Sequence, residues 1–325
     1  MLDRNIDDPC AWHAGDLGPD DWRIPIAETV LAELDAVARD LATHEGNIED
    51  LVPSGFELSA TTKFMGAVRR QLDRDIGFAV LDRLPFERWD TWTSKAVVWL
   101  VTSLLGPIVM QKWNGTRVYD VRDTGKRLEH GVRRSITNLE QEFHTDGGWL
   151  TITPNIIGLA CLQQAPIGGS SRVASLATVH NMLRDLEPRR LARLYRAFWW
   201  DRQAEHPKTE APCSRHPIYA SDGQRLTVRY YDDYVRQGQK LMNSPLDHEG
   251  AEAIEAMKAL VETPETWIEF HLEPGQIEYA NNHLLAHART GFQDAGGRDE
   301  RRHLLRLWVR DTGGIALEPG ALAAD

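Results

Sequence analysis

A histidine and an aspartate two positions apart are the first residues whose types and spacing could do chemistry. His144 and Asp146 stand within residues 141–149, and Gly147 and Gly148 follow them directly. On an extended backbone, side chains at positions i and i+2 project to the same face, and glycine lets the chain turn afterwards. The pair therefore offers one nitrogen and one oxygen ligand to a metal ion. A surface histidine beside an aspartate is the simpler alternative, because so short a motif often occurs by chance.

A second histidine-containing segment could supply a third ligand. Residues 273–290 begin with Pro274-Gly275, which predicts a tight turn before a strand that delivers His283 or His287 to its end. Two histidines and one carboxylate on one face of an octahedral ion leave three positions open, as is typical of non-heme Fe(II) oxygenases. The same two histidines have the spacing of an HExxH zinc motif. However, position 284 is leucine rather than glutamate, and the preceding turn and strand argue against a helix.

An arginine-bearing strand near the C-terminal end could bind an anion. Alternation over residues 302–310 places Arg302, Leu304, Arg306 and Trp308 on one face and the intervening residues on the other. If the first face lines a cavity, it brings two guanidinium groups there, and arginine suits a carboxylate through paired hydrogen bonds. A carboxylate-binding arginine near an iron site implies a dicarboxylate cosubstrate. A solvated arginine face is the alternative.

Helices and short strands must position these residues. Apolar periodicity predicts helices over residues 26–41, near 60–72 and over about 86–105, with helical inserts near 176–197 and 249–261. Elsewhere, runs rich in Val, Ile, Thr and aromatics lie between Gly, Pro and Asn. These runs predict short strands, among them residues 77–84, 155–163, 226–231, 267–272 and 276–280.

This order of elements favours an α+β, mainly β fold: a double-stranded β-helix (jelly-roll) core flanked by helices. A parallel α/β fold is disfavoured, because the strands follow one another instead of alternating with helices. The sequence shows no internal repeat and no low-complexity linker. We therefore expect a single domain over residues 1–325, with a helical N-terminal part over about 1–105 and the jelly-roll core over about 106–312.

Composition disfavours several classes of partner. The 325 residues carry 37 Lys and Arg against 48 Asp and Glu, a net charge of −11, which disfavours nucleic acid and membrane surfaces. Cys10, Cys161 and Cys213 lack CxxC spacing and suit buried, reduced thiols. No apolar run reaches the ~20 residues of a spanning helix, and the acidic N-terminus is unlike a signal peptide. We expect a cytoplasmic protein with a small-molecule substrate, and a homo-oligomer stays open.

Three blocks in order resemble the taurine dioxygenase (TauD/TfdA) superfamily of Fe(II)/2-oxoglutarate-dependent oxygenases, including its clavaminate synthase-like members. The blocks are residues 143–146, residues 168–171, and residues 282–289 followed by Arg302 and Arg306. Together they lie within residues 143–310, more than half of the chain. The resemblance implies a jelly-roll fold, an Fe(II) ion, 2-oxoglutarate as cosubstrate and O2 as oxidant.

The resemblance also assigns roles to single residues. It implies that the iron ligands are His144, Asp146 and His287, and that Arg302 pairs with the distal carboxylate of 2-oxoglutarate. Ser171 stands where the family commonly uses threonine to hydrogen-bond the same carboxylate, so the hydroxyl is kept. Arg306 matches a position that meets an anionic group of the substrate in some relatives.

The implied reaction is the oxidation of an unactivated C–H bond, with release of succinate and CO2. Hydroxylation is the first expectation, and desaturation or cyclisation are the alternatives. Halogenation is disfavoured, because related halogenases have a small residue in place of Asp146. The expected substrate is a small amino acid or another carboxylate-bearing metabolite. Two other functions stay open: a zinc-dependent hydrolase that uses the same three ligands, and a non-catalytic jelly-roll binding protein.

Residues 111–123 and 138–142 are expected to supply the pocket wall. Their Glu140 and Glu142 could meet a cationic amine, although solvent exposure is the default for both. Three aromatics could flank a substrate but are more simply explained as core residues: Trp113, Tyr119 and Trp149. Five histidines are expected at the surface: His13, His44, His206, His216 and His248.

Overall fold

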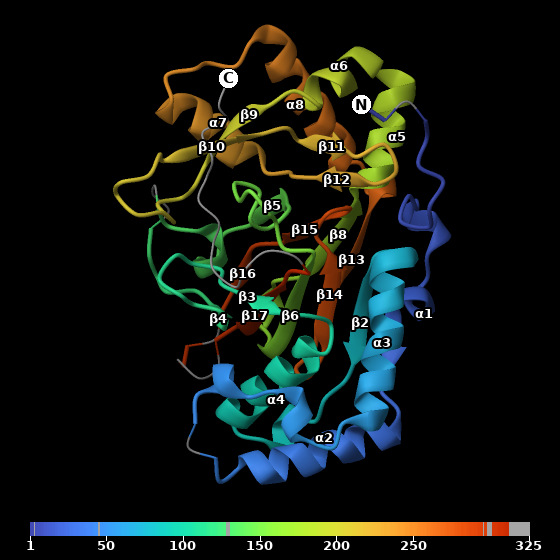
Figure 1. Ribbon diagram of the computed structural model, residues 1–325, viewed down its shortest axis with the longest axis vertical. Helices are drawn as coiled ribbons and strands as arrows, with labels where there is room; N and C mark the ends of the chain where they lie inside the picture. Colours follow the sequence, from blue (N-terminus) through green and yellow to red (C-terminus); the bar gives the residue numbers. More distant parts are fainter. Residues whose placement is uncertain (3, 45, 128–130, 295, 298–300, 312–325) are drawn as a thin grey trace.

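Two sheets form the centre of the molecule in the computed structural model, which describes residues 1–2, 4–44, 46–127, 131–294, 296–297 and 301–311 (Figure 1). The main sheet has the order β1 (Arg23–Pro25), β2 (Phe78–Asp82), β14 (Ile277–Asn281), β6 (Ile156–Gln163), β17 (His303–Val309) and β3 (Ile108–Val109), and β4 (Tyr119–Val121) also pairs with β17. The second sheet has the order β13 (Trp267–Phe270), β8 (Ser171–Ser175), β15 (Leu285–Arg289) and β5 (Gln141–His144). All pairings in both sheets are antiparallel except β1 with β2.

Three two-stranded ribbons and eight helices surround these sheets within the described residues. The ribbons pair β9 (Phe198–Asp201) with β10 (Cys213–His216), β11 (Tyr219–Ser221) with β12 (Leu226–Val228), and β7 (Ile167–Gly168) with β16 (Phe292–Gln293). The N-terminal helices are α1 (Pro19–Trp22), α2 (Glu28–Leu41), α3 (Ser59–Arg74) and α4 (Thr91–Ser103). The later helices are α5 (Leu176–Leu186), α6 (Pro188–Leu194), α7 (Asp232–Leu241) and α8 (His248–Val261).

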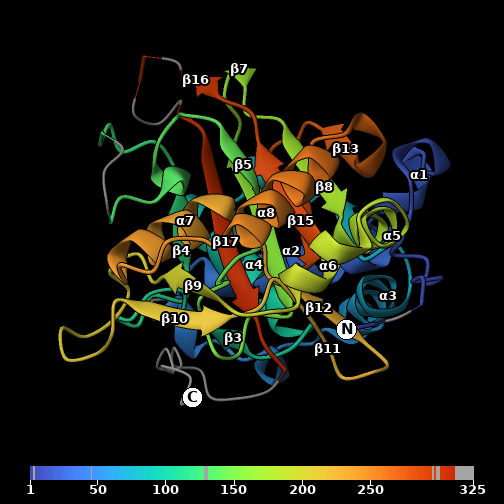
Figure 2. The same ribbon diagram turned by 90° about the horizontal axis from the view of Figure 1, so that it is seen from above.

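The two groups of helices lie at opposite ends of the molecule. Helices α2, α3 and α4 lie at the bottom of Figure 1, whereas α5 to α8 lie at the top and face the viewer in Figure 2. The outward apolar side chains of β17, among them Leu305 and Leu307, pack with those of α2, α3 and α4 in one hydrophobic cluster. A second cluster fills the space between the sheets and continues to α5, α6 and α8. The jelly roll is therefore held between two helical layers, as predicted.

Most predicted elements are confirmed with small shifts at their ends. The strand expected at 155–163 is β6, and the helices expected at 26–41, 60–72 and 249–261 are α2, α3 and α8. The helix expected over 86–105 begins later, at Thr91, where the Asp90 side chain accepts a hydrogen bond from the Thr93 amide. A capping side chain satisfies an amide that would otherwise lack a partner, which fixes the start of the helix there.

Two helical features depart from the sequence analysis. The insert expected near 176–197 is two helices, because Pro188 starts α6 and forces Glu187 out of the helical region, with φ −140° and ψ 54°. Helix α7 was not predicted at all. Its sequence is mostly polar, and four of its ten residues are buried: Asp232, Val235, Gly238 and Gln239.

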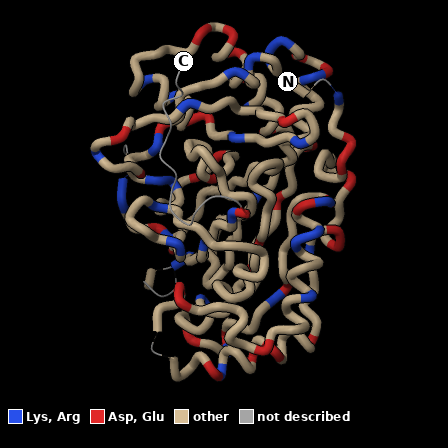
Figure 3. Tube along the Cα trace, viewed as in Figure 1, with Lys and Arg blue, Asp and Glu red and all other residues tan. Residues whose placement is uncertain are grey.

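Charged side chains of both signs are interspersed along the outer segments (Figure 3). In the described part of the chain, no helix has the length and apolar character needed to cross a membrane. The longest apolar run instead forms α4, whose Val97, Val98 and Leu100 are buried against the main sheet. The single-domain assignment of residues 1–325 stays a prediction, and residues 312–325 lie outside the described residues.

The packing of β17 against the N-terminal helices predicts a large loss of stability on truncation. Leu305 is fully buried, and Leu305→Ala should lower the free energy of unfolding by about 2–5 kcal/mol, because it leaves a cavity between sheet and helices. Urea denaturation followed by circular dichroism measures this difference. The matched control is Leu186→Ala at a 66% exposed position, which should change stability by about 0.5 kcal/mol or less. Equal effects of the two substitutions would contradict this packing.

Candidate metal centre and its anion pockets

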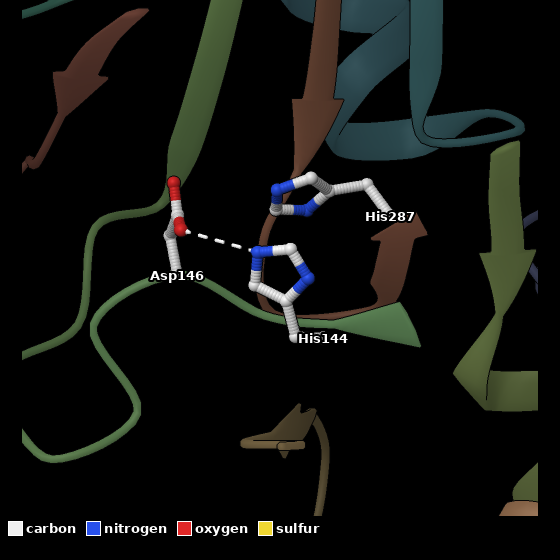
Figure 4. A group of neighbouring side chains, drawn as sticks. All are labelled: His144, Asp146 and His287. Atoms are coloured by element: carbon white, nitrogen blue, oxygen red, sulfur yellow. Dashed lines mark ion pairs between the residues drawn. The ribbon is translucent and has the colours of Figure 1, made fainter. Parts of the chain in front are cut away.

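Antiparallel pairing of β5 with β15 brings two histidines together. His144 and His287 lie opposite each other in register, and their ring centroids are 4.1 Å apart. Asp146 follows β5, and its carboxylate Oδ1 lies 3.6 Å from His144 Nε2 (Figure 4). One ligand atom from each of these three buried residues lies within 4.8 Å of the others. The structure thus assembles the three predicted iron ligands.

A tight turn after β5 places Asp146. Gly147 has a φ of +67°, which favours glycine, and a Cβ on Gly148 would lie 2.8 Å from the Trp200 ring. The buried Asn282, from a distant part of the chain, stabilises the backbone of this turn. Its side chain accepts a hydrogen bond from the Asp146 amide at 2.7 Å and donates one to the Asp146 carbonyl at 2.9 Å. The predicted glycine turn is therefore confirmed: Gly147 is required by its backbone conformation and Gly148 by the close approach of Trp200.

Both carboxylate oxygens of Asp146 are held by strand β17. Arg306 Nη1 donates to Oδ1 at 3.0 Å, and Trp308 Nε1 donates to Oδ2 at 2.7 Å. Gln111 in turn accepts a hydrogen bond from Arg306 Nε at 2.7 Å. Burial alone would raise the pKa of the Asp146 carboxyl, but Arg306, the two histidines and Trp308 together outweigh this effect and lower that pKa to about 2. Asp146 is therefore an anion at neutral pH.

The two histidines are neutral and can bind a metal. Burial lowers the pKa of His144 and lowers that of His287 to about 3. His144 Nδ1 lies 2.9 Å from the Glu142 carbonyl, which can only accept, so Nδ1 carries the proton and Nε2 carries the lone pair. The Gln141 amide lies 2.8 Å from this Nε2 and donates to it. A neutral imidazole with a fixed tautomer is the form that ligates metals.

A first cavity beside the histidines contains the predicted cosubstrate residues. It is lined by Ser171, His287, Arg302 and Arg306, together with Leu304. Arg302 is 2% exposed and donates to Gln164 Oε1 at 3.2 Å and to the Gly169 carbonyl at 3.4 Å, but its Nη1 has no hydrogen-bond partner among the described residues. The predicted orientation of the strand is therefore confirmed, and its arginine face is not solvated.

A second cavity adjoins the first, and both are lined by His144 and Arg306. Its lining includes Arg133, Trp149, Tyr234 and Arg306. Arg133 Nη2 lies 2.9 Å from Glu205 Oε1, while Arg133 Nε and Arg306 Nη2 are buried without a hydrogen-bond partner among the described residues. Unused guanidinium donors in a buried pocket favour an anionic group as their partner.

Three other candidate site residues lie outside the metal cluster and the two cavities. His283, the competing third ligand, hydrogen-bonds Thr153 Oγ1 at 2.9 Å and is not part of the metal cluster. Glu140 is exposed, and Glu142 lies 3.5 Å from Lys258 rather than in either cavity.

The burial of the aromatic, histidine and cysteine residues agrees only partly with the expectations. Tyr119 and Trp149 are buried as expected, but Trp113 is 55% exposed, so the core assignment was wrong for it. His13, His44 and His248 are exposed, whereas His206 and His216 are half-buried. Burial lowers the pKa of His216 to about 3, so its surface assignment was wrong. All three cysteines are free and buried, as predicted.

Four polar residues of the site had no role assigned from the sequence: Gln111, which begins the expected pocket wall, and Arg133, Glu278 and Asn282. Glu278 had a signal, since it is a charged residue inside an apolar strand, and Asn282 stands within a motif block. Gln111 and Arg133 come from irregular segments between strands, whose sequence does not tell where their side chains point.

The sequence as a whole was compared with protein families. A model of the family described as "Taurine catabolism dioxygenase TauD, TfdA family" matches residues 38–308. The chain belongs to this family. Its dioxygenase class and the TauD/TfdA resemblance are thereby confirmed.

Individual proteins and solved structures resemble the chain over most of its length. FR-33289 synthase from Streptomyces rubellomurinus (strain ATCC 31215) is 29% identical, covering 89% of this chain and 85% of that protein. Taurine hydroxylase-like protein SAT17 from Stachybotrys chartarum (strain CBS 109288 / IBT 7711) is 25% identical, covering 95% of this chain and 81% of that protein.

A structure of asparagine oxygenase with Fe(II), 2S,3S-3-hydroxyasparagine and succinate has a TM-score of 0.69 at 19% identity, covering 92% of this chain and 99% of that chain. A structure of the non-heme iron oxygenase OrfP with Fe and alpha-ketoglutaric acid has a TM-score of 0.66 at 15% identity, covering 89% and 94%. These two structures share the jelly-roll fold predicted for the chain.

The metal cluster predicts which histidine matters for iron. His287→Ala should weaken Fe(II) binding by more than about 100-fold, because loss of mere outer-sphere partners already costs about 10–100-fold. Anaerobic equilibrium dialysis with metal analysis measures the affinity, and the Asp146–Arg306 ion pair stays in place in this variant.

His283→Gln is the matched control for that experiment. It should bind Fe(II) within about twofold of the unmodified protein, because His283 lies outside the ligand cluster. Retained iron in His287→Ala, or lost iron in a folded His283→Gln, would contradict the ligand assignment.

Proposed function

We propose that this dioxygenase binds Fe(II) through His144, Asp146 and His287 and uses 2-oxoglutarate and O2 to oxidise an unactivated C–H bond. The observation that carries the proposal is the buried cluster of two neutral imidazoles and one carboxylate, with ligand atoms within 4.8 Å of one another. This is the facial donor set that suits Fe(II) and leaves positions for a cosubstrate and oxygen. The OrfP structure with Fe and alpha-ketoglutaric acid supports the same cofactors.

The first cavity fits 2-oxoglutarate. The unpartnered Nη1 of Arg302 is a buried donor that a carboxylate would satisfy, and the Ser171 hydroxyl lines the same cavity. Bound iron and 2-oxoglutarate supply oxidation coupled to decarboxylation, with succinate and CO2 as products. The role of the chain is to fix the two ends of the cosubstrate: the iron end between the histidines and the distal carboxylate at Arg302.

The donors that line the second cavity suit the anionic group of a small substrate. Arg306 Nη2 and Arg133 Nε are its free donors, and Trp149 and Tyr234 supply its aromatic walls. Because Arg306 also bonds Asp146, an anion held there would lie next to the candidate metal ligand. A small amino acid or another carboxylate-bearing metabolite has the required charge, and hydroxylation is the expected outcome. Asparagine oxygenase and OrfP, which carry hydroxylated amino acids in their structures, support this substrate class.

The two alternative functions are less well supported. A zinc hydrolase needs the three ligands but has no use for Arg302, a buried arginine with a free donor in the same cavity. A non-catalytic binding protein would not need the two histidine rings to converge, and their centroids are only 4.1 Å apart.

A substrate screen tests the proposed reaction. Protein loaded with Fe(II) and 2-oxoglutarate should form succinate with matching O2 uptake in the presence of a small anionic metabolite, and His287→Ala should lose both signals. Succinate is measured by chromatography and O2 with an electrode. Conversion of a substrate by the zinc-loaded protein without O2 uptake would contradict the proposal and favour the hydrolase.

Arg133 gives a separate test of the substrate pocket. With the substrate that the screen yields, Arg133→Gln should raise KM by about 10- to 150-fold, which corresponds to about 1.5–3 kcal/mol for a lost hydrogen bond to a charged group. Steady-state kinetics measures KM, and the affinity for 2-oxoglutarate should not change.

The neighbouring Arg134 provides the control for Arg133. Its side chain is more exposed and lies 3.3 Å from Asp233, outside the lining of the second cavity. Arg134→Gln should therefore leave KM within about twofold, as expected for a surface ion pair. Equal KM values for Arg133→Gln and the unmodified protein would remove Arg133 from the substrate site.

A further inference from the structure

Glu278 is a buried carboxyl group with no ion-pair partner among the described residues. It lies on β14, in the middle of the main sheet, and is 0% exposed. Its neighbours in register are Val80 on β2 and Leu159 on β6, neither of which is polar. Neither carboxyl oxygen has a partner with full hydrogen-bond geometry among the described residues, although the Ser171 hydroxyl lies near enough to lower the pKa of this carboxyl group. An acid in such a place needs either a proton or a ligand.

The carboxyl group of Glu278 faces the first cavity. Glu278 lines it together with Ser171 of β8, His287 and Arg289 of β15, and Arg302 before β17. No ion pair within 4 Å joins Glu278 to an arginine in the described part of the chain, although Arg302 has a free Nη1. An unpartnered acid and an unpartnered guanidinium donor therefore line the cavity assigned to 2-oxoglutarate.

Other titratable groups near this pair are few. Cys161 on β6 lies near Arg302, but burial raises its pKa to about 12, so it stays a neutral thiol. Asp294 interacts with the Arg302 charge, its Oδ1 accepts from the Arg302 amide at 2.8 Å, and it is not part of the cavity lining. The charge that varies near neutral pH is thus on Glu278 itself. Burial raises its pKa to about 7, against the opposing effects of Ser171 and Arg302.

We propose that Glu278, in its protonated form, donates a hydrogen bond to the distal carboxylate of 2-oxoglutarate, so that cosubstrate binding takes up one proton. The inference rests on the proposed function. Two ionised carboxylates cannot share one buried site without strong repulsion, whereas a neutral acid beside a carboxylate supplies a donor. The proton comes from solvent and stays on Glu278 while the cosubstrate is bound.

Binding of 2-oxoglutarate should weaken as the pH rises. The binding-competent form is the protonated one, which dominates at pH 6 and falls to about a tenth at pH 8 for a pKa of about 7. The apparent Kd for 2-oxoglutarate should therefore rise about tenfold between pH 6 and pH 8. Glu278→Gln keeps a donor but cannot titrate, so its Kd should stay flat over the same range.

Anaerobic titration of the Fe(II) protein with 2-oxoglutarate, followed by its metal-to-ligand charge-transfer band, measures these Kd values without turnover. Glu269→Gln is the control, because Glu269 is exposed on β13 and pairs with Arg172 at 2.6 Å. It should keep the full pH dependence of the unmodified protein.

A second measurement on the unmodified protein covers the case in which Glu278→Gln fails to fold. Calorimetry at pH 8 in buffers of different ionisation enthalpy should give an uptake of close to one proton for each 2-oxoglutarate bound. Binding with a pH-independent Kd or without proton uptake, or an equal pH dependence in a folded Glu278→Gln, would overturn this proposal alone. Failure of the unmodified protein to bind 2-oxoglutarate at any pH would overturn the proposed function and this proposal with it.

Discussion

The buried carboxylate of Asp146 is the constraint on which the site depends. A charge taken out of water must be met by charges and donors of the protein, and removing one of them leaves the others uncompensated. Asp146 meets this requirement through Arg306 and Trp308 of β17, while Asn282 holds its backbone. Strand β17 belongs to the main sheet and His144 to the second, so this carboxylate ties the two sheets together at the metal centre. The positions of the three candidate ligands therefore depend on how β17 of the main sheet packs against the second sheet.

The same site gathers positive charge inside an acidic chain. Arg302 and Arg289 are buried beside the first cavity, and burial lowers the pKa of Arg302 to about 10 and that of Arg289 to about 9. Both stay protonated at neutral pH, and their desolvation is offset best when an anion binds. The net charge of −11 therefore disfavours polyanionic partners without hindering small anions, which meet a locally basic interior. Glu278 moderates this basic site and makes its occupancy sensitive to pH.

The sequence predicts features that depend on a short segment, and it does not predict features that depend on contacts between distant segments. The spacing of His144 and Asp146, the alternation of Arg302 and Arg306, and the period of α2 are all properties of short segments, and the structure confirms each of them. Arg133 acts through contacts with Glu205 and the second cavity, which depend on segments far apart in the chain. Helix α7 is short and mostly polar, so its few apolar residues gave no clear signal, and Pro188 splits a helix that periodicity alone would continue. Choosing His287 over His283 required the family resemblance, because both lie at the end of the same predicted turn and strand.

The proposed activity requires that His144, Asp146 and His287 hold one Fe(II) ion. Anomalous diffraction at the iron edge, from crystals soaked with Fe(II) under anaerobic conditions, locates the metal without reference to turnover. The account predicts one strong peak within bonding distance of His144 Nε2, an Asp146 carboxylate oxygen and a His287 ring nitrogen. A peak at other residues, or an ordered site that contains no metal at saturating Fe(II), would contradict it.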